Sequence, residues 1–196
     1  MWASHRVAPS HVQIPMRPEV SQPSPPDPDH VRYTARPFPP YRFIPGLFPH
    51  PRRDPKGHAF GRPEPVPKPV TPENWRESET YLYGIDLFNF AYWWECHEEL
   101  ESLWHTVGHD SEQGLFLQGI VQIAAANLRR FMEPDDQKAG LSLMEKGLEK
   151  LRDFSGVYMG VDVQRFRMAV DASLRQRTAQ PLTISLVGCV PEDSAG

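Results

Sequence analysis

Ionisable and aromatic side chains are concentrated in residues 87–104, which hold one histidine and four carboxylates among six aromatic residues. His97 and Glu101 are four residues apart, so on a helix they lie one turn apart on the same face, within reach of one metal ion. Glu98 takes the position at which the His-Glu-x-x-His zinc motif keeps its general base. The spacing predicts that His97 and Glu101 bind a divalent metal such as zinc, with Glu98 as the catalytic base or a supporting carboxylate.

Two protein ligands do not complete a catalytic zinc site, which uses three and leaves a further position open. The proline-rich segment that precedes the helices contains His50, Asp54 and His58, all of which are suitable donors. We therefore expect any third ligand to come from this segment.

A structural interpretation competes with the metal site. Charged groups buried among aromatic residues need partners, and the amides of Gln118 and Gln122 would serve, fixing the register of packed helices. Alternatively, the two amides would orient water or substrate at a metal centre. Arg129 shares their face and could pair with Glu98 or Glu101, which would make a metal unnecessary, or bind an anionic substrate. The residues themselves leave both interpretations open.

The pattern of apolar residues predicts an all-α fold, a compact bundle of about four helices within residues 73–178. We expect helices over residues 73–107, with a bend near Gly84, then over 111–132, 136–152 and 161–177. The second helix carries Gly119 and a run of alanines, which allow a neighbouring helix to approach closely. Residues 179–196 are expected to form an extended tail docked on the bundle.

The N-terminal part of the chain is set apart by proline, because 18 of the 22 prolines lie in residues 1–70. Residues 1–31 have no periodicity and are expected to be disordered. Residues 32–72 alternate prolines with aromatic residues, which predicts an extended strap laid on the helical body. The aromatic residues are Phe38, Tyr41, Phe43 and Phe48. The alternative is a proline-rich tail that binds a partner.

Charge and composition narrow the class of protein. Residues 1–70 carry a net charge of +5 and residues 71–196 a net charge of −9, so the expected helical body is acidic and has no basic stripe for nucleic acid. Only two cysteines are present and no run of eighteen apolar residues occurs. We expect a cytoplasmic protein that acts on an unknown small molecule or protein, without nucleic acid or membrane, and that could form a homo-oligomer.

Two blocks of sequence carry a family resemblance. The first reads Phe88-Asn89 and then Glu95-x-His97-Glu98-x-Leu100-Glu101-x-x-Trp104, and the second reads Phe116-Leu117-Gln118-Gly119-Ile120-Val121-Gln122-x-Ala124-Ala125-Ala126. Together they resemble the all-helical family of domain of unknown function 309 (DUF309), often labelled a predicted metal-dependent hydrolase. The strap resembles an extension carried by one branch of that family.

The resemblance implies a helical bundle in which six residues of the two blocks converge. Those residues are His97, Glu98, Glu101, Trp104, Gln118 and Gln122, and we assign substrate-binding or structural support to Asn89, Trp94, Glu95, Trp104 and Arg129. Family members often carry histidine where this chain has Leu128-Arg129, so one possible metal ligand is missing. The expected function is a metal-dependent hydrolase, and the alternative is a non-catalytic binding or scaffolding module with a structural polar core.

Overall fold

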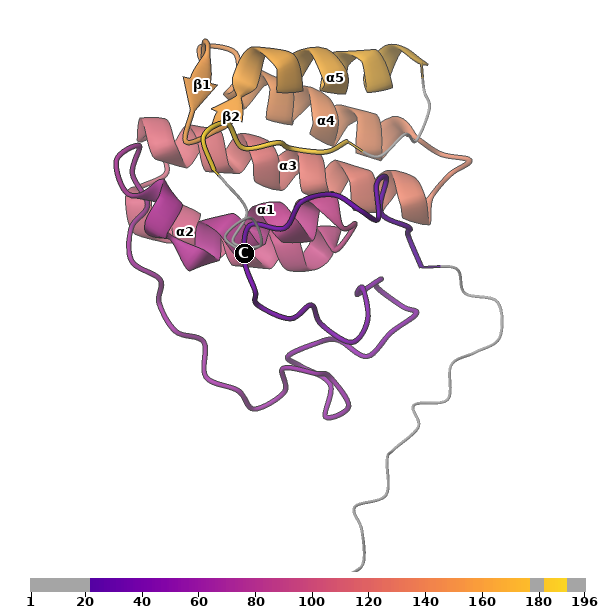
Figure 1. The fold of residues 1–196 in the computed structure, drawn as a ribbon. Coiled ribbons are helices and arrows are strands. Elements are labelled where there is room, and N and C mark those ends of the chain that lie inside the picture. The colour runs from indigo at the N-terminus through magenta and orange to yellow at the C-terminus, as the bar shows by residue number, and fades with distance from the viewer. Residues whose placement is uncertain (1–21, 177–181, 190–196) are drawn as a thin grey trace, which may run out of the picture.

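Five α-helices form the body of the computed structural model, which describes residues 22–176 and 182–189 (Figure 1). The helices are α1 (Glu79–Asn89), α2 (Trp93–Val107), α3 (Glu112–Met132), α4 (Lys138–Lys150) and α5 (Val163–Gln176). A 3-10 turn, η1 (Trp75–Glu77), precedes α1, and a small antiparallel hairpin of β1 (Val157–Tyr158) and β2 (Val161–Asp162) precedes α5. This architecture confirms the predicted all-α bundle with an N-terminal strap. None of the described helices meets the length and apolarity needed to cross a membrane.

The predicted continuous helix over residues 73–107 is wrong. Residues 75–77 form only η1, and the helix proper is divided between α1 and α2 by three residues around Ala91. Ala91 has a positive φ of 62°, and the N–H of Tyr92 turns back to the carbonyl oxygen of Leu87 at 2.9 Å. The break contains neither glycine nor proline, so its backbone turn left no signal in the sequence.

The remaining helices agree with the sequence pattern to within a few residues. Ser111 caps α3 by accepting a 2.9 Å hydrogen bond from the N–H of Gly114, which satisfies one free donor of the first turn. The hairpin before α5 was not predicted, because its two strands have only two residues each. Residues 182–186 of the predicted tail form no helix, Leu186 bridges to Val161 of β2, and a turn follows at residues 187–188.

Helices α3 and α4 approach closely through two glycines. A Cβ added at Gly119 would lie 3.2 Å from the carbonyl oxygen of Gly147, and one added at Gly147 would lie 2.9 Å from that of Gly119. The side chains of Ile123 and Leu151 fill the space on either side. The contact confirms the predicted role of Gly119 in close helix packing.

The strap runs along the side of the body formed by α1 and α2 (Figure 1). Phe38 stacks on Tyr92 with ring centroids 4.9 Å apart and also packs against Phe90 at 4.9 Å. Tyr41 and Phe43 are buried. The predicted disorder of residues 1–31 falls largely on residues 1–21, which lie outside the described residues.

Candidate functional site

The buried face of α2 is centred one residue away from the predicted histidine. Cys96, Leu100 and Leu103 are completely buried and pack into the core. Each residue turns a helix by about 100°, so His97 and Glu101 lie on the flank of that face rather than at its centre. Their side chains are 31% and 35% exposed, and the expected burial of this pair is therefore wrong. The pair is open to solvent and to ligands.

His97, Glu98 and Glu101 nevertheless form a compact cluster, which we call the His–Glu–Glu group. One ligand atom from each residue lies within 4.8 Å of the other two. Nδ1 of His97 is 3.6 Å from Oε1 of Glu98 and 3.8 Å from Oε2 of Glu101. The interaction with Glu98 raises the pKa of His97, burial opposes the rise, and the charge of Glu101 adds to it. The group favours a positive charge at its centre.

The donor set of this group suits a divalent transition metal. Imidazole nitrogen and carboxylate oxygen are the zinc ligands of many hydrolytic sites, and both also suit manganese and iron. Ligand atoms that share one ion at about 2 Å lie roughly 3–3.5 Å from each other. The atoms of the group are separated by slightly more than this, so small side-chain rotations would bring them around one ion.

The strap does not supply the expected third donor to this group. His50 accepts a hydrogen bond at Nδ1 from the N–H of Arg52, while Asp54 accepts one from the N–H of Lys56. His58 packs its ring against Tyr41. Among the described residues, the His–Glu–Glu group is the only set of three or more histidine, cysteine or acidic side chains whose ligand atoms lie close enough to share an ion. The third side chain of that group, Glu98, is on α2 itself.

Helix α3 holds the two predicted glutamines, Gln118 and Gln122, and both are partly exposed. Within residues 22–176 and 182–189, neither amide hydrogen-bonds to the His–Glu–Glu group, and Oε1 of Gln122 is buried without a partner. Arg129 does not pair with Glu98 or Glu101, because its guanidinium bonds at 2.8 Å to Glu133, the residue that follows α3. The expected pairing that would replace a metal is not formed.

Two predicted support residues near the ends of the helices have clear structural partners. Asn89 holds the C-terminal segment, since its Oδ1 accepts from the N–H of Ile184 at 2.7 Å and its Nδ2 donates to the carbonyl oxygen of Ile184 at 2.9 Å. Trp104 stacks on His109 with centroids 4.2 Å apart, while its Nε1 is buried without a partner among the described residues. Asn89 therefore acts in folding.

Glu95 links the strap to α2. Its side chain is 7% exposed, and Oε1 accepts a 2.8 Å hydrogen bond from the N–H of Phe43. Oε2 is buried and has no hydrogen-bond partner in the described part of the chain. Burial raises the pKa of Glu95 to about 7, and the Phe43 N–H limits the rise. The carboxylate is held in a site that penalises its charge.

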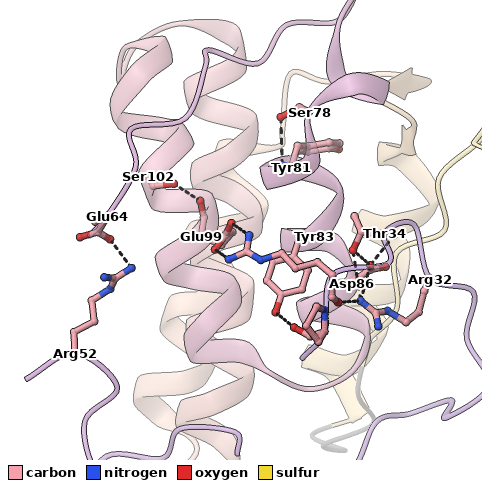
Figure 2. A network of polar contacts seen from close by, with 12 residues as sticks. Arg32, Thr34, Arg52, Glu64, Ser78, Tyr81, Tyr83, Asp86, Glu99 and Ser102 are labelled. Carbon is pink, nitrogen blue, oxygen red and sulfur yellow. Dashed lines mark hydrogen bonds and ion pairs between the residues drawn. The ribbon is translucent and has the colours of Figure 1, made fainter. Parts of the chain in front are cut away.

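Asp86 is a second polar anchor of the strap and was not among the predicted site residues. It is completely buried, and it accepts hydrogen bonds from the N–H of Tyr33 (2.8 Å), the N–H of Thr34 (3.0 Å) and the hydroxyl of Thr34 (2.8 Å) (Figure 2). Arg32 lies 3.5 Å from the same carboxylate. An acidic residue inside the apolar run of α1 was the only available signal, because a buried charge requires partners.

A cleft of about 520 Å³ opens between the strap and α2, beside the His–Glu–Glu group. Glu98 belongs both to the group and to the lining of the cleft, which Trp94 and Glu95 also line. Trp94 packs against Phe43 and His50 of the strap. A larger groove of about 610 Å³ between α4 and α5 contains none of the predicted site residues. The cleft next to Glu98 is therefore the better candidate for a binding site.

Comparison with known families supports the sequence resemblance. Residues 81–139 match the family described as Domain of unknown function (DUF309), so this part of the chain is similar to that family. The matched residues include the whole His–Glu–Glu group and both glutamines, whereas the strap lies outside them. No curated protein matches the chain.

Proposed function

We propose that the protein is a metal-dependent hydrolase that binds a divalent cation at the His–Glu–Glu group and its substrate in the adjacent cleft. The observation that carries this proposal is the convergence of an imidazole and two carboxylates within 4.8 Å of one another at the edge of that cleft. When bound, a divalent cation would acidify a water molecule and polarise the oxygen of a substrate carbonyl or phosphoryl group.

The residues of α2 have different roles in this proposal. His97 and Glu101 hold the cation, since they project from neighbouring turns of one helix. Glu98 faces the same centre and also lines the cleft, so it is placed either to complete the ligand set or to take a proton from the attacking water. The aromatic ring of Trp94 forms part of the cleft wall and would exclude water from the bound substrate.

Metal binding is the first test. Protein purified without a histidine tag should bind close to one equivalent of Zn²⁺ or Mn²⁺ in calorimetric titrations, and the bound cation should raise the melting temperature. His97→Ala and Glu101→Gln should each abolish that binding. His105→Ala is the matched control on the same helix, because Nδ1 of His105 lies 3.3 Å from Nε2 of His109 and this exposed pair could hold an adventitious ion.

The hydrolytic step needs a separate test. Metal-loaded protein should cleave at least one chromogenic ester, amide or phosphate, and Glu98→Gln should lower kcat by about 10²-fold or more if Glu98 acts as the base. If Glu98→Gln still binds zinc but has lost activity, Glu98 acts as the base and not as a metal ligand. Absence of metal binding by the wild-type protein would overturn the proposal before any substrate is sought.

A second candidate function is a non-catalytic binding module with a structural polar core. The observation that favours it is the shared behaviour of three buried polar residues. Asp86, Asn89 and Glu95 each bond the backbone of a distant segment, and so act in docking rather than chemistry. Under this alternative the cleft binds a ligand, and His97→Ala changes neither metal content nor ligand affinity.

A further inference from the structure

The outer wall of the cleft is a rigid structure. Residues 50–62, here called the turn segment, close through successive backbone hydrogen bonds, including Gly57 N–H to the carbonyl oxygen of Asp54 at 2.8 Å and Ala59 N–H to that of Pro51 at 3.0 Å. A Cβ at Gly57 would lie 2.3 Å from the carbonyl oxygen of Pro51, so only glycine fits there. The turn segment therefore holds its side chains in fixed positions along the cleft.

Cationic and hydrogen-bonding groups of the turn segment face the cleft. Arg52, His58 and Arg62 all line it. Burial lowers the pKa of His58, and the nearby charges of Arg62 and Arg52 lower it further. Arg62 forms no ion pair with any residue in the described ranges, and Nε2 of His58 is buried without a partner there. Arg52 pairs with Glu64 at 3.3 Å (Figure 2), but that glutamate is 59% exposed and the pair is easily exchanged.

The opposite wall carries aromatic residues and three glutamates, Glu95, Glu98 and Glu99. Phe38 and Trp94 line the cleft. Glu99 is paired with Arg36 at 2.5 Å, and Oε1 of Glu95 accepts the hydrogen bond from the N–H of Phe43. Glu98 lies on this wall and belongs to the His–Glu–Glu group. A ligand that satisfies the turn segment would therefore carry negative charge at one end and apolar or uncharged atoms next to the rings.

We propose that this cleft binds a small organic anion, with its carboxylate or phosphate held by Arg62 and Arg52 beside His58 and the rest of the molecule directed toward Glu98. The cleft volume is in the range of small-molecule sites. If the protein is the proposed hydrolase, such anions are its substrate class, and only this catalytic role rests on the proposed function. Binding of the anion itself requires no metal. A cation beside Glu98 would offset its negative charge, so anion and metal should strengthen each other's binding.

The test uses the full chain treated with a chelator, at low salt, and three probes of similar size. Benzoate and phenylphosphonate represent the two kinds of anion, and benzamide is the neutral match of benzoate. The probe's affinity is followed by the indole N–H signal of Trp94 in nitrogen-15 spectra. At least one anion should bind at millimolar concentration, and benzamide should bind at least tenfold more weakly. Arg62→Gln should lower the affinity for that anion by about tenfold.

Arg152→Gln provides the control, because this exposed arginine lines the separate groove between α4 and α5. Its affinity for the anion should equal that of the wild type. Gly57→Ala should also lower the affinity for the anion, because the added methyl group would distort the turn segment. Failure of both anions to bind, equal binding of benzamide, or an unchanged affinity in Arg62→Gln would each overturn the inference. Because no metal is present, none of these outcomes bears on the His–Glu–Glu group.

Discussion

The backbone N–H of Phe43 donates a 2.8 Å hydrogen bond to Oε1 of Glu95, which joins the strap to α2 two residues before His97. The strap is therefore bonded to the helix that carries the candidate site. Its turn segment stands opposite Glu98 across the cleft. A change in the docking of the strap should alter both stability and the shape of the cleft.

Stability should depend on the titration of Glu95. Burial raises its pKa in the folded protein to about 7, above the ordinary value of 4.5, so the folded state binds this proton more tightly than the unfolded state. The contribution of Glu95 to the free energy of unfolding is greatest below pH 4.5 and falls as the pH rises to about 7. Glu95→Gln keeps an acceptor for Phe43 and carries no charge.

Urea denaturation of the wild type and Glu95→Gln at pH 5 and pH 8 measures this effect. From pH 5 to pH 8, the free energy of unfolding of the variant should rise by about 2–3 kcal/mol relative to that of the wild type. The other buried carboxylates are common to both proteins, so their titration cancels in the difference. An identical stability difference at both pH values would show that Glu95 titrates normally in the folded state.

Asp86→Asn should loosen the strap. The substitution places an NH₂ group where the carboxylate now accepts hydrogen bonds from the N–H groups of Tyr33 and Thr34, and it removes the charge beside Arg32. We expect a loss of about 2–4 kcal/mol in urea denaturation, with faster proteolysis of the strap. Asp153→Asn, at an 84% exposed side chain, should change stability by no more than about 0.5 kcal/mol. Equal effects of the two substitutions would contradict the anchoring role.

Asn89→Asp should release the C-terminal segment. The new carboxylate keeps the acceptor for the N–H of Ile184 but sets an oxygen against the Ile184 carbonyl in place of the donor. Hydrogen exchange in residues 182–189 should become faster. Asn74→Asp is the matched control, since Asn74 also bonds two backbone groups but at the surface, and it should leave exchange in that segment unchanged. Unaltered exchange in Asn89→Asp would refute the assignment.

Gly147→Ala should separate α3 from α4. The added methyl group would lie 2.6 Å from Cγ1 of Ile123 and 2.9 Å from the carbonyl oxygen of Gly119, and a backbone atom cannot move aside cheaply. We expect a loss of about 1–3 kcal/mol in thermal or urea unfolding. Ser142→Ala on the exposed side of α4 should be neutral or slightly stabilising. If Gly147→Ala does not change the free energy of unfolding, α3 and α4 are not in close contact at this position.

Periodicity predicted much of the fold because most helices here have one clearly apolar side and standard ends. The predicted boundary between residues 107 and 111 falls where Gly108 follows α2 and Ser111 caps α3, and Gly119 marked a close helix contact. The division between α1 and α2 was missed, since the turn at Ala91 is imposed by packing rather than by a residue that favours it.

The site was predicted less completely than the fold. The spacing of His97 and Glu101 identified the cluster, but the aromatic residues around it suggested a burial that the helix does not provide. The cleft could not be predicted, because it depends on how the strap folds back over α2. Glu95 and Asp86 gained their roles from backbone N–H groups some fifty residues away, which no local pattern reveals.

The central claim is that a divalent cation binds at the His–Glu–Glu group. The most direct test is an anomalous difference map at the zinc absorption edge, from crystals of untagged protein grown or soaked with Zn²⁺. We predict the strongest peak at bonding distance from His97 and Glu101, on the side facing Glu98, and its loss in His97→Ala. A map with no peak there, or with zinc only between His105 and His109, would contradict the account.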